Sequence, residues 1–396
     1  MSAGAGRLRA ATGTLAGAAA MITLVTIASR LVGFARSLVQ SFAVGTEGVG
    51  SAFTAANLLP NVLFEVAAGG ALAGSVVPLL AGPIARRAGT EVSRIASALL
   101  GWTLVVLVPL GALLALLAEP IASLLMLPKH PELVDVTATF VRVFALQVPL
   151  YGLAVVLGSI LQAHKRFFWQ AFSPLLSSLA VIVVFLVFAG LAGGDQKDVA
   201  ALSGQAIAWL GWGTTAGVAV LALPLVLPVH RLGVRLRPTL RFPGGEAVRA
   251  RNLAFAGVGA LVAQQLSVLA IMGAAYRFGP EQTFPTYWYA QQVYLLPYAV
   301  LAFPLATSTF PRLAEHVAHA RHDAYRRLLA TTTRTLLVVA GLGVAALIAA
   351  SAAVEAVFAR IATGSVAGLG GAVAAMAVGI VGFSLLLHLS RALYTI

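Results

Sequence analysis

Two arginines stand inside the first long apolar stretch of the chain, where charge is costly. The stretch 16–42 predicts a helix, and steps of 100° per residue place Arg30 and Arg36 on one face with Ser29 and Ser37. Leucine, isoleucine, valine and phenylalanine fill most of the remaining surface. An unpaired arginine at the centre of a bilayer costs at least about 2.5 kcal/mol. The polar face is therefore expected to look into a bundle interior or a water-filled cavity.

The two guanidinium groups suit a phosphate-bearing anion. Each offers N–H donors in a planar fork, which makes paired, charge-assisted hydrogen bonds to phosphate oxygens. We therefore expect Arg30 and Arg36 to bind an anion. Two other interpretations stay open: the helix lies flat on one leaflet, or both arginines only pair with structural partners.

Other polar side chains lie within apolar stretches. Glu65 is the one carboxylate well inside such a stretch, and it either pairs with Arg30 or Arg36 or takes up protons. Arg142 either faces the same cavity or extends outward to the membrane surface. Glutamine amides inside spans usually bond between helices, with cavity lining as the alternative. The glutamines of this kind are Gln264, Gln265, Gln291 and Gln292.

Patterns of enzymes and metal sites are missing from the sequence. It has no HExxH, P-loop or GxSxG pattern, and its lack of cysteine excludes thiolate metal sites and cysteine nucleophiles. His316, His319 and His322 stand beside arginines, which favours a solvated basic loop over a metal site. We expect no enzyme activity and no cofactor.

The composition is that of a membrane protein. Of the 396 residues, 60% are hydrophobic and 10% are charged, against about 25% charged in soluble domains. Apolar runs of about 20 residues or more predict spanning helices. We predict an all-α polytopic fold with ten spans, at 16–42, 53–82, 92–118, 134–162, 168–192, 201–228, 252–276, 284–310, 328–352 and 369–391.

Lysine and arginine concentrate in alternate linkers between these spans. One set of linkers holds most of the arginines, for example Arg86 and Arg231, and the other set holds acids such as Glu47, Glu119 and Glu281. The positive-inside rule then puts both chain ends in the cytoplasm. The same bias accounts for the net charge of +13 without nucleic acid as a partner.

The second and eighth spans share a pattern that indicates an internal repeat. Leu58-Leu59-Pro60 is matched by Leu295-Leu296-Pro297, and Pro78 by Pro311. Two parallel six-helix halves are a known transporter layout. We expect an N-terminal six-helix lobe over 1–230, a basic linker over 231–251, and four helices of an incomplete second lobe over 252–396.

Several motifs together resemble the MurJ (MviN) family. They are Ser29-Arg30-Leu31-Val32-Gly33-Phe34-Ala35-Arg36, Asn57-Leu58-Leu59-Pro60-Asn61, Val77-Pro78-Leu79-Leu80-Ala81 and Gly158-Ser159-Ile160-Leu161-Gln162-Ala163. The similarity runs from about Thr14 to the last residue. The resemblance implies a flippase of the multidrug/oligosaccharidyl-lipid/polysaccharide superfamily that moves lipid II, with two lobes around a cationic cavity. It also implies two further C-terminal helices, so the chain is expected to lack its C-terminal part.

The resemblance carries over only some of the family's cavity residues. The two helix-1 arginines fall on Arg30 and Arg36, and the helix-1 serine on Ser29. Where the family commonly has Asp, Arg and Glu, this chain has Ser51, Phe64 and Gly69, and the Asp-Arg pair of helix 8 falls on Gln291 and Gln292. We expect Glu65, Arg142 and Gln292 to join the three helix-1 residues in substrate binding.

The expected function is export of a polyprenyl-diphosphate-linked peptidoglycan precursor by alternating access. The expected partners are this anionic lipid, membrane lipids and cell-wall synthesis proteins, and the expected location is the bacterial inner membrane. Three rivals stay open: a flippase for another polyprenyl-linked saccharide, a drug/cation antiporter, and a non-transporting scaffold for cell-wall enzymes. The antiporter would need several intramembrane carboxylates, whereas this chain offers Glu65.

Overall fold

The computed structural model is helical throughout the part of the chain that it describes. The described residues are 24–66, 73–242, 258–298, 309, 313, 315–317, 319 and 321–393, and they contain no strand. They form two compact units, one ending at Phe284 and the other beginning at Pro285. Residues 16–23, Gly69, 252–257, 299–308 and Pro311, which carry parts of the predicted spans and repeat, lie outside the described residues.

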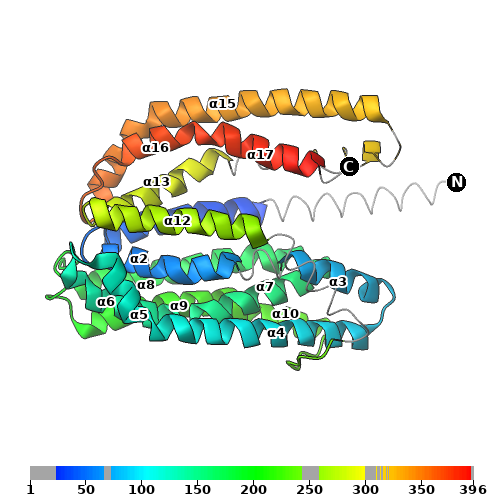
Figure 1. Cartoon of the computed structure of the whole chain (residues 1–396), viewed down its shortest axis with the longest axis horizontal. Helices are drawn as coiled ribbons and strands as arrows, with labels where there is room; N and C mark the ends of the chain where they lie inside the picture. The colour runs from blue at the N-terminus through cyan, green and yellow to red at the C-terminus, as the bar shows by residue number, and fades with distance from the viewer. Residues whose placement is uncertain are drawn as a thin grey trace. The chain divides into compact units, whose positions relative to one another are not determined.

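The first unit begins with a helix over 24–43 and continues as a bundle of roughly parallel helices (Figure 1). Its further helices are α2 (Val49–Phe64), α3 (Ala73–Ala85), α4 (Gly89–Leu116), α5 (Ala118–Met126), α6 (Val134–Phe144), α7 (Gln147–Ala163), α8 (Phe167–Ala192), α9 (Gly204–Ala222), α10 (Val226–Arg231) and α12 (Val258–Phe278), with short 3-10 turns at Pro131–Leu133 and Leu223–Leu225. Within it α2 packs on α6 and α7, and α4 packs on α7.

The second unit is built around one long helix. α13 (Thr283–Pro297) leads into it, and α15 (His322–Ile361) runs alongside α16 (Leu369–Ala377) and α17 (Gly379–Leu393) (Figure 1). The predicted lobe boundaries at 230 and 252 stay a prediction.

The all-α membrane class is confirmed. Among the described residues, six helices are long and apolar enough to cross a membrane, or seven if the pair α16 and α17, bent by 41°, is one span. The total of ten spans stays a prediction.

The predicted span 134–162 lies within one candidate span, Pro131–Ala163, which has a break inside it between α6 and α7. α6 ends at Phe144 and α7 begins at Gln147, two residues before Pro149. Proline lacks an N–H and its ring crowds the carbonyl four residues earlier, which here belongs to Ala145. Val148 N–H bonds that carbonyl instead, at 3.2 Å, in a tighter turn. The break follows directly from the proline.

Two further differences from the expected spans have local causes. α5, which was not expected, begins after the end of α4 with Pro120 in its first turn, a position that favours proline. α15 is 40 residues long and continues past the predicted end at 352. Its Glu355 carboxylate accepts hydrogen bonds from the N–H groups of Gly368 and Gly370, at 3.1 and 2.8 Å. These bonds hold the buried part of the carboxylate at the start of α16.

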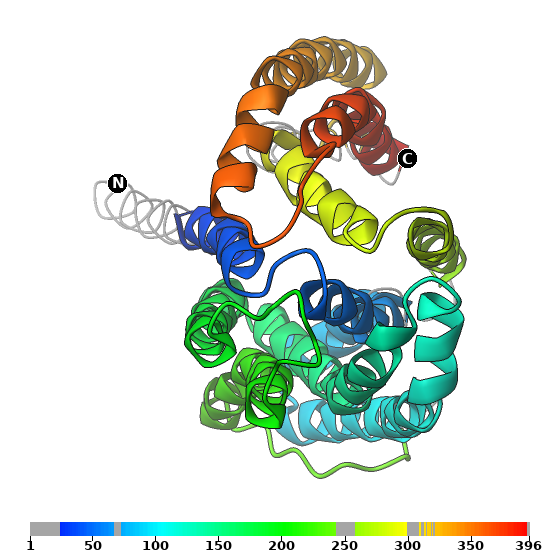
Figure 2. The same ribbon diagram turned by 90° about the vertical axis from the view of Figure 1, so that its left-hand side faces the viewer.

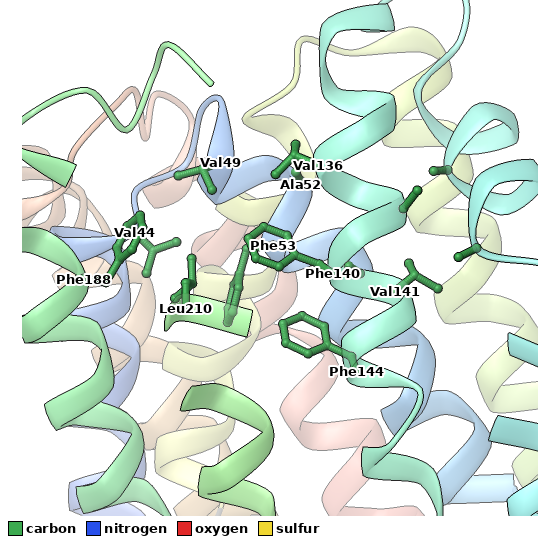
Figure 3. Close-up of a cluster of buried hydrophobic side chains, with 14 of the residues drawn as sticks. Val44, Val49, Ala52, Phe53, Val136, Phe140, Val141, Phe144, Phe188 and Leu210 are labelled. Carbon is green, nitrogen blue, oxygen red and sulfur yellow. The ribbon is translucent and has the colours of Figure 1, made fainter. Parts of the chain in front are cut away.

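Four phenylalanines form the centre of the first unit's core. The Phe53 ring meets the rings of Phe140, Phe144 and Phe185 edge-on, with centroids 5.5 to 5.8 Å apart. Figure 3 shows Phe53, Phe140 and Phe144 of this group. All four side chains are at most 2% exposed. This cluster fixes α2 against α6 and α8, and so holds the loop that follows helix 24–43.

We predict that Phe53→Ala lowers the stability of the first unit by about 3–5 kcal/mol, because it removes a buried ring and leaves a cavity. Thermal unfolding of the purified protein in detergent measures the loss. Phe278→Ala is the matched control, because Phe278 is 79% exposed, and it should change stability by less than about 0.5 kcal/mol. Equal losses in the two variants would contradict the assigned core.

Candidate functional site

The polar face of helix 24–43 passes from exposed to buried along its length. Arg30 is exposed, Ser29 and Arg36 are half-buried, and Gln40 and Ser41 near the end are 8% and 0% exposed. The polar side chains at the far end are thus enclosed by protein, while the first arginine is open to its surroundings. The site is accessible from one end of the helix.

Arg36 lies beside an aromatic residue of another helix, α7. Tyr151 of α7 is close enough to Arg36 for an electrostatic interaction. The Tyr151 ring in turn contacts the ring of Phe64 on α2, with centroids 4.8 Å apart. Asn61, one turn before Phe64, is half-buried and donates its amide to the Asn57 carbonyl at 2.7 Å. α7 therefore borders Arg36 through Tyr151, and α2 contacts that tyrosine through Phe64.

Neither arginine is neutralised by an acidic side chain in the part of the chain that the structure describes. No ion pair there involves Arg30 or Arg36, and the ion pairs that do form lie elsewhere. Gly33, between them on the polar face, would bring a Cβ within 4 Å of no heavy atom. The face thus combines unneutralised positive charge with open space, which are the two requirements for holding an anion.

The other expected site residues are placed differently. Glu65 is exposed at the end of α2 and forms no ion pair with Arg30 or Arg36 within the described residues. Arg142 points outward and pairs with Glu119 at the start of α5, at 3.4 Å, which fits the outward alternative. Gln292 is half-buried on α13 in the second unit. The binding roles of these three residues stay predictions.

The far end of helix 24–43 is closed by what we call the Glu281 junction, formed by Gly48, Ser51, Tyr276 and Glu281. The Gly48 N–H donates to Glu281 Oε2 at 3.0 Å, and Ser51 Oγ donates to the Glu281 carbonyl at 2.9 Å. The Tyr276 hydroxyl donates to the Ser51 carbonyl at 2.9 Å. The loop before α2 is thereby tied to the end of α12 and the loop behind it.

Gly48 is a requirement of this junction. Its backbone has φ +54°, a conformation that residues other than glycine rarely adopt. A Cβ there would also collide with the carbonyls of Gln196 and Lys197. The next residue, Val49, donates its N–H to the Gln196 carbonyl at 3.0 Å. The loop after α8 therefore packs under the same turn.

An acidic cavity of about 380 Å³ opens beside the junction. Lys197, at its rim, pairs with Glu47 at 3.0 Å. Among the described residues, no group of three or more His, Asp or Glu side chains is arranged to hold a metal ion. The charged residues that line the cavity are Glu132, Asp135, Lys197, Asp198 and Glu281.

Burial raises the pKa of the Glu281 carboxyl above its ordinary value of 4.5, and the acids Glu47 and Glu132 add to this effect. The Gly48 N–H and His130 act in the opposite direction but do not cancel it. The protonated form is therefore favoured more in the closed junction than in water.

No local pattern in the sequence identifies the junction residues. Glu281 is one of several acids in the less basic linkers, and Tyr276 is the last residue of the predicted span 252–276. Gly48 follows Gly45 in a short linker, and such glycines indicate a turn but not its partner. The contacts join residues more than 200 positions apart, which local patterns do not encode.

A family model described as "Lipid II flippase MurJ" matches residues 41–396. A probable lipid II flippase MurJ of Rhizobium meliloti is 28% identical over 296 residues, which are 73% of this chain and 53% of the relative. The lipid II flippase MurJ of Burkholderia cenocepacia is 27% identical over 318 residues, 77% of this chain and 58% of the relative. The chain thus spans about half the length of the curated relatives it matches.

Solved structures show the same fold. The chain matches a lipid II flippase MurJ in an inward closed conformation with a TM-score of 0.76 at 17% identity, over 94% of this chain and 75% of the other. It matches an inward-facing multidrug resistance MATE family transporter of the MOP superfamily with a TM-score of 0.72 at 15% identity, over 92% and 81%.

The raised pKa of Glu281 predicts a pH dependence of stability. Below pH 4.5 the carboxyl is protonated in both folded and unfolded protein, so its contribution is fully present. As the pH rises through the raised pKa, the folded protein must release a proton that it holds more tightly, and stability falls. The unfolding temperature of the wild type in detergent should therefore fall over this range more steeply than that of Glu281→Gln.

Asp135→Asn is the control for this measurement, because Asp135 is an exposed acid that lines the same cavity and is not among the groups that shift the pKa of Glu281. It should keep the pH dependence of the wild type. A Glu281→Gln protein with the same slope as the wild type would rule out Glu281 as the titrating group.

Proposed function

The chain belongs to the MurJ family of lipid II flippases, and on that basis we propose that it carries lipid II, a polyprenyl-diphosphate-linked peptidoglycan precursor, across the membrane. We propose further that the transfer runs from the cytoplasmic to the outer leaflet of the bacterial inner membrane. The relatives that it matches carry this substrate in their names.

The observation that supports this proposal is the pair of arginines on one accessible helix face. Arg30 and Arg36 have no acidic partner among the described residues, and Gly33 between them faces open space. A diphosphate supplies the missing negative charge and accepts bidentate hydrogen bonds from both guanidinium groups. A scaffold protein would have no need for such a face.

The closed end of the helix fits an alternating-access cycle. With the N-terminus in the cytoplasm, as the distribution of arginines favours, the Glu281 junction lies on the outer side and the Arg30 end on the inner side. The headgroup enters from the inner leaflet, and its exit requires the junction to open. An inside-negative potential assists export of negative charge by about 2.3 kcal/mol per charge per 100 mV.

The proposed partners follow from this role. The lipid tail stays in the bilayer while the headgroup crosses, so membrane lipids surround the path of the substrate. Enzymes of cell-wall synthesis are the proposed suppliers and users of the substrate. The basic surface follows the positive-inside rule, so we propose no nucleic acid partner and no cofactor.

Loss of the helix-1 charges should abolish transport. We predict that the full-length gene restores growth to cells depleted of their own lipid II flippase, and that Arg30→Ala and Arg36→Ala do not. Each variant removes a guanidinium that the diphosphate needs. Arg326→Ala is the control, because Arg326 is an exposed arginine near the start of α15, and it should restore growth.

The abundance of every variant in the membrane is measured alongside growth. Rescue by both helix-1 variants would remove the proposed arginine site while keeping the substrate. A well-expressed wild type that fails to rescue would redirect the proposal to another polyprenyl-linked saccharide.

A bulky residue at Gly33 tests the space beside the arginines without removing their charge. Gly33→Leu should fold normally, because a Cβ at this position meets no heavy atom within 4 Å, yet it should slow transport by at least about tenfold. The readout is the rate at which lipid II becomes accessible on the outer face of proteoliposomes. Transport at the wild-type rate by Gly33→Leu would show that the substrate does not occupy this space.

A further inference from the structure

An extended segment lies along the side of α4 that faces away from helix 24–43. Residues 232–242 follow α10 and carry no helix or strand, and we call them the basic strap. Figure 2 shows the strap as a thin trace along the outer edge of the first unit, beneath α4. The strap is therefore on a different side of this unit from the candidate transport site.

The strap is held to α4 through its backbone. The Arg235 N–H donates to Ser93 Oγ at 3.2 Å, and the Arg237 N–H donates to Ser97 Oγ at 3.0 Å. Ser97 also accepts the Thr239 N–H at its carbonyl, at 3.2 Å. Because these bonds use backbone groups of the strap, they leave its arginine side chains available to bind another molecule.

Gly101 lets the strap lie this close. It follows Ser93 and Ser97 at intervals of four residues, so the three share one face of α4. A Cβ on Gly101 would overlap the backbone of Thr239. About two turns of α4, with two small hydroxyl side chains and a glycine on one face, therefore form the surface on which the strap packs.

The strap covers α4 with apolar side chains and turns its arginines outward. Val234 belongs to the buried cluster that includes Ile95 and Leu99, and Leu236 packs against it. All seven residues of α4 from Ile95 to Gly101 are buried, whereas Arg235, Arg237 and Arg241 are exposed.

These arginines lack acidic partners in the part of the chain that the structure describes. The ion pairs found there involve Arg86, Arg142, Lys197 and His130, and none includes a strap arginine. Arg94, on the same helix turn as Ser93, is likewise exposed and outside these pairs. The edge of the unit thus presents four arginines that form no ion pair with any described acidic residue.

The strap ends where the lipid-facing surface of α4 begins. Trp102 donates its indole N–H to the Leu240 carbonyl at 3.1 Å, and the two side chains are 45% and 49% exposed. Beyond them α4 exposes Val105 and Val106, at 48% and 51%. Tryptophan concentrates at the level of lipid headgroups. Ser93 and Trp102 are nine residues apart, so the arginines lie within about 14 Å of that level.

We propose that the basic strap is a binding site for the headgroup phosphates of anionic phospholipids in the adjoining leaflet, separate from the site of the transported lipid. Under the proposed topology this is the cytoplasmic leaflet. Arg235, Arg237 and Arg241 contact the phosphates, and Trp102 and Leu240 lie against the upper acyl chains. The proposal concerns a lipid that stays bound, and it holds whichever lipid-linked substrate the protein carries.

The test uses the purified full chain and two lipids, phosphatidylglycerol and phosphatidylcholine, with retained lipid measured by native mass spectrometry. The wild type should bind phosphatidylglycerol at least about tenfold more tightly than phosphatidylcholine. The triple variant Arg235→Gln/Arg237→Gln/Arg241→Gln should lose this preference, since one arginine near the surface contributes about fivefold.

Two matched controls separate the strap from net charge. The triple variant Arg321→Gln/Arg326→Gln/Arg327→Gln removes the same charge from exposed positions around the start of α15 and should keep the preference. Gly101→Ala displaces the strap without changing its charge, and it should weaken the preference for phosphatidylglycerol at least about threefold. Gly89→Ala lies in the same helix, at a position where a Cβ meets no described atom within 4 Å, and it should leave the preference unchanged.

The outcomes decide the proposal independently of transport. A wild type without lipid preference overturns it, and so does equal loss in the two triple variants. If Gly101→Ala fails to fold, the comparison of the triple variants still decides. Growth rescue by the strap variants bears on neither result, so a failure here leaves the proposed transport function untouched.

Discussion

A guanidinium group inside an apolar layer is costly unless it contacts water, an acidic partner or a ligand, and the first unit is built around two such groups. Arg30 and Arg36 sit on a helix whose far end is sealed and whose near end is open. The seal is built from backbone and side-chain hydrogen bonds at Gly48, Ser51 and Glu281. Exposure therefore falls along the helix from Arg30 to Ser41, and the hydrogen-bonded turn that follows holds the buried end in place.

Ser51 is a position where this chain differs from the family pattern and where the structure shows what surrounds the difference. The resemblance places an aspartate where this chain has Ser51, so a carboxylate is missing from the start of α2. Here Glu281, in the loop after α12, provides a carboxylate at the same place and accepts the Gly48 N–H at 3.0 Å. Ser51 itself remains part of the contact, because its hydroxyl donates to the Glu281 carbonyl at 2.9 Å.

The sequence was sufficient for whatever depends on hydropathy and helical periodicity. The polar face with Arg30 and Arg36, the membrane class and the family were all predicted from it, and the break before Pro149 follows from the chemistry of proline. The sequence was insufficient where a side chain contacts a residue that is far away along the chain. Arg142 had two equally open orientations, and its pairing with Glu119 depends on α5, a helix that hydropathy alone did not separate from α4. The Glu281 junction depends on loops that carry no periodic pattern.

The length of α15 has a mechanical consequence. Its 40 residues extend over about 60 Å, roughly twice the thickness of the hydrocarbon layer. The predicted span within this helix begins at residue 328, so the exposed turn with Arg326 and Arg327 before it is expected to lie outside the layer. If the helix tilts by about 10° about the centre of that span, its His322 end moves by about 5 Å. A small rearrangement among the apolar helices is therefore expected to cause a larger displacement of the basic residues at this end.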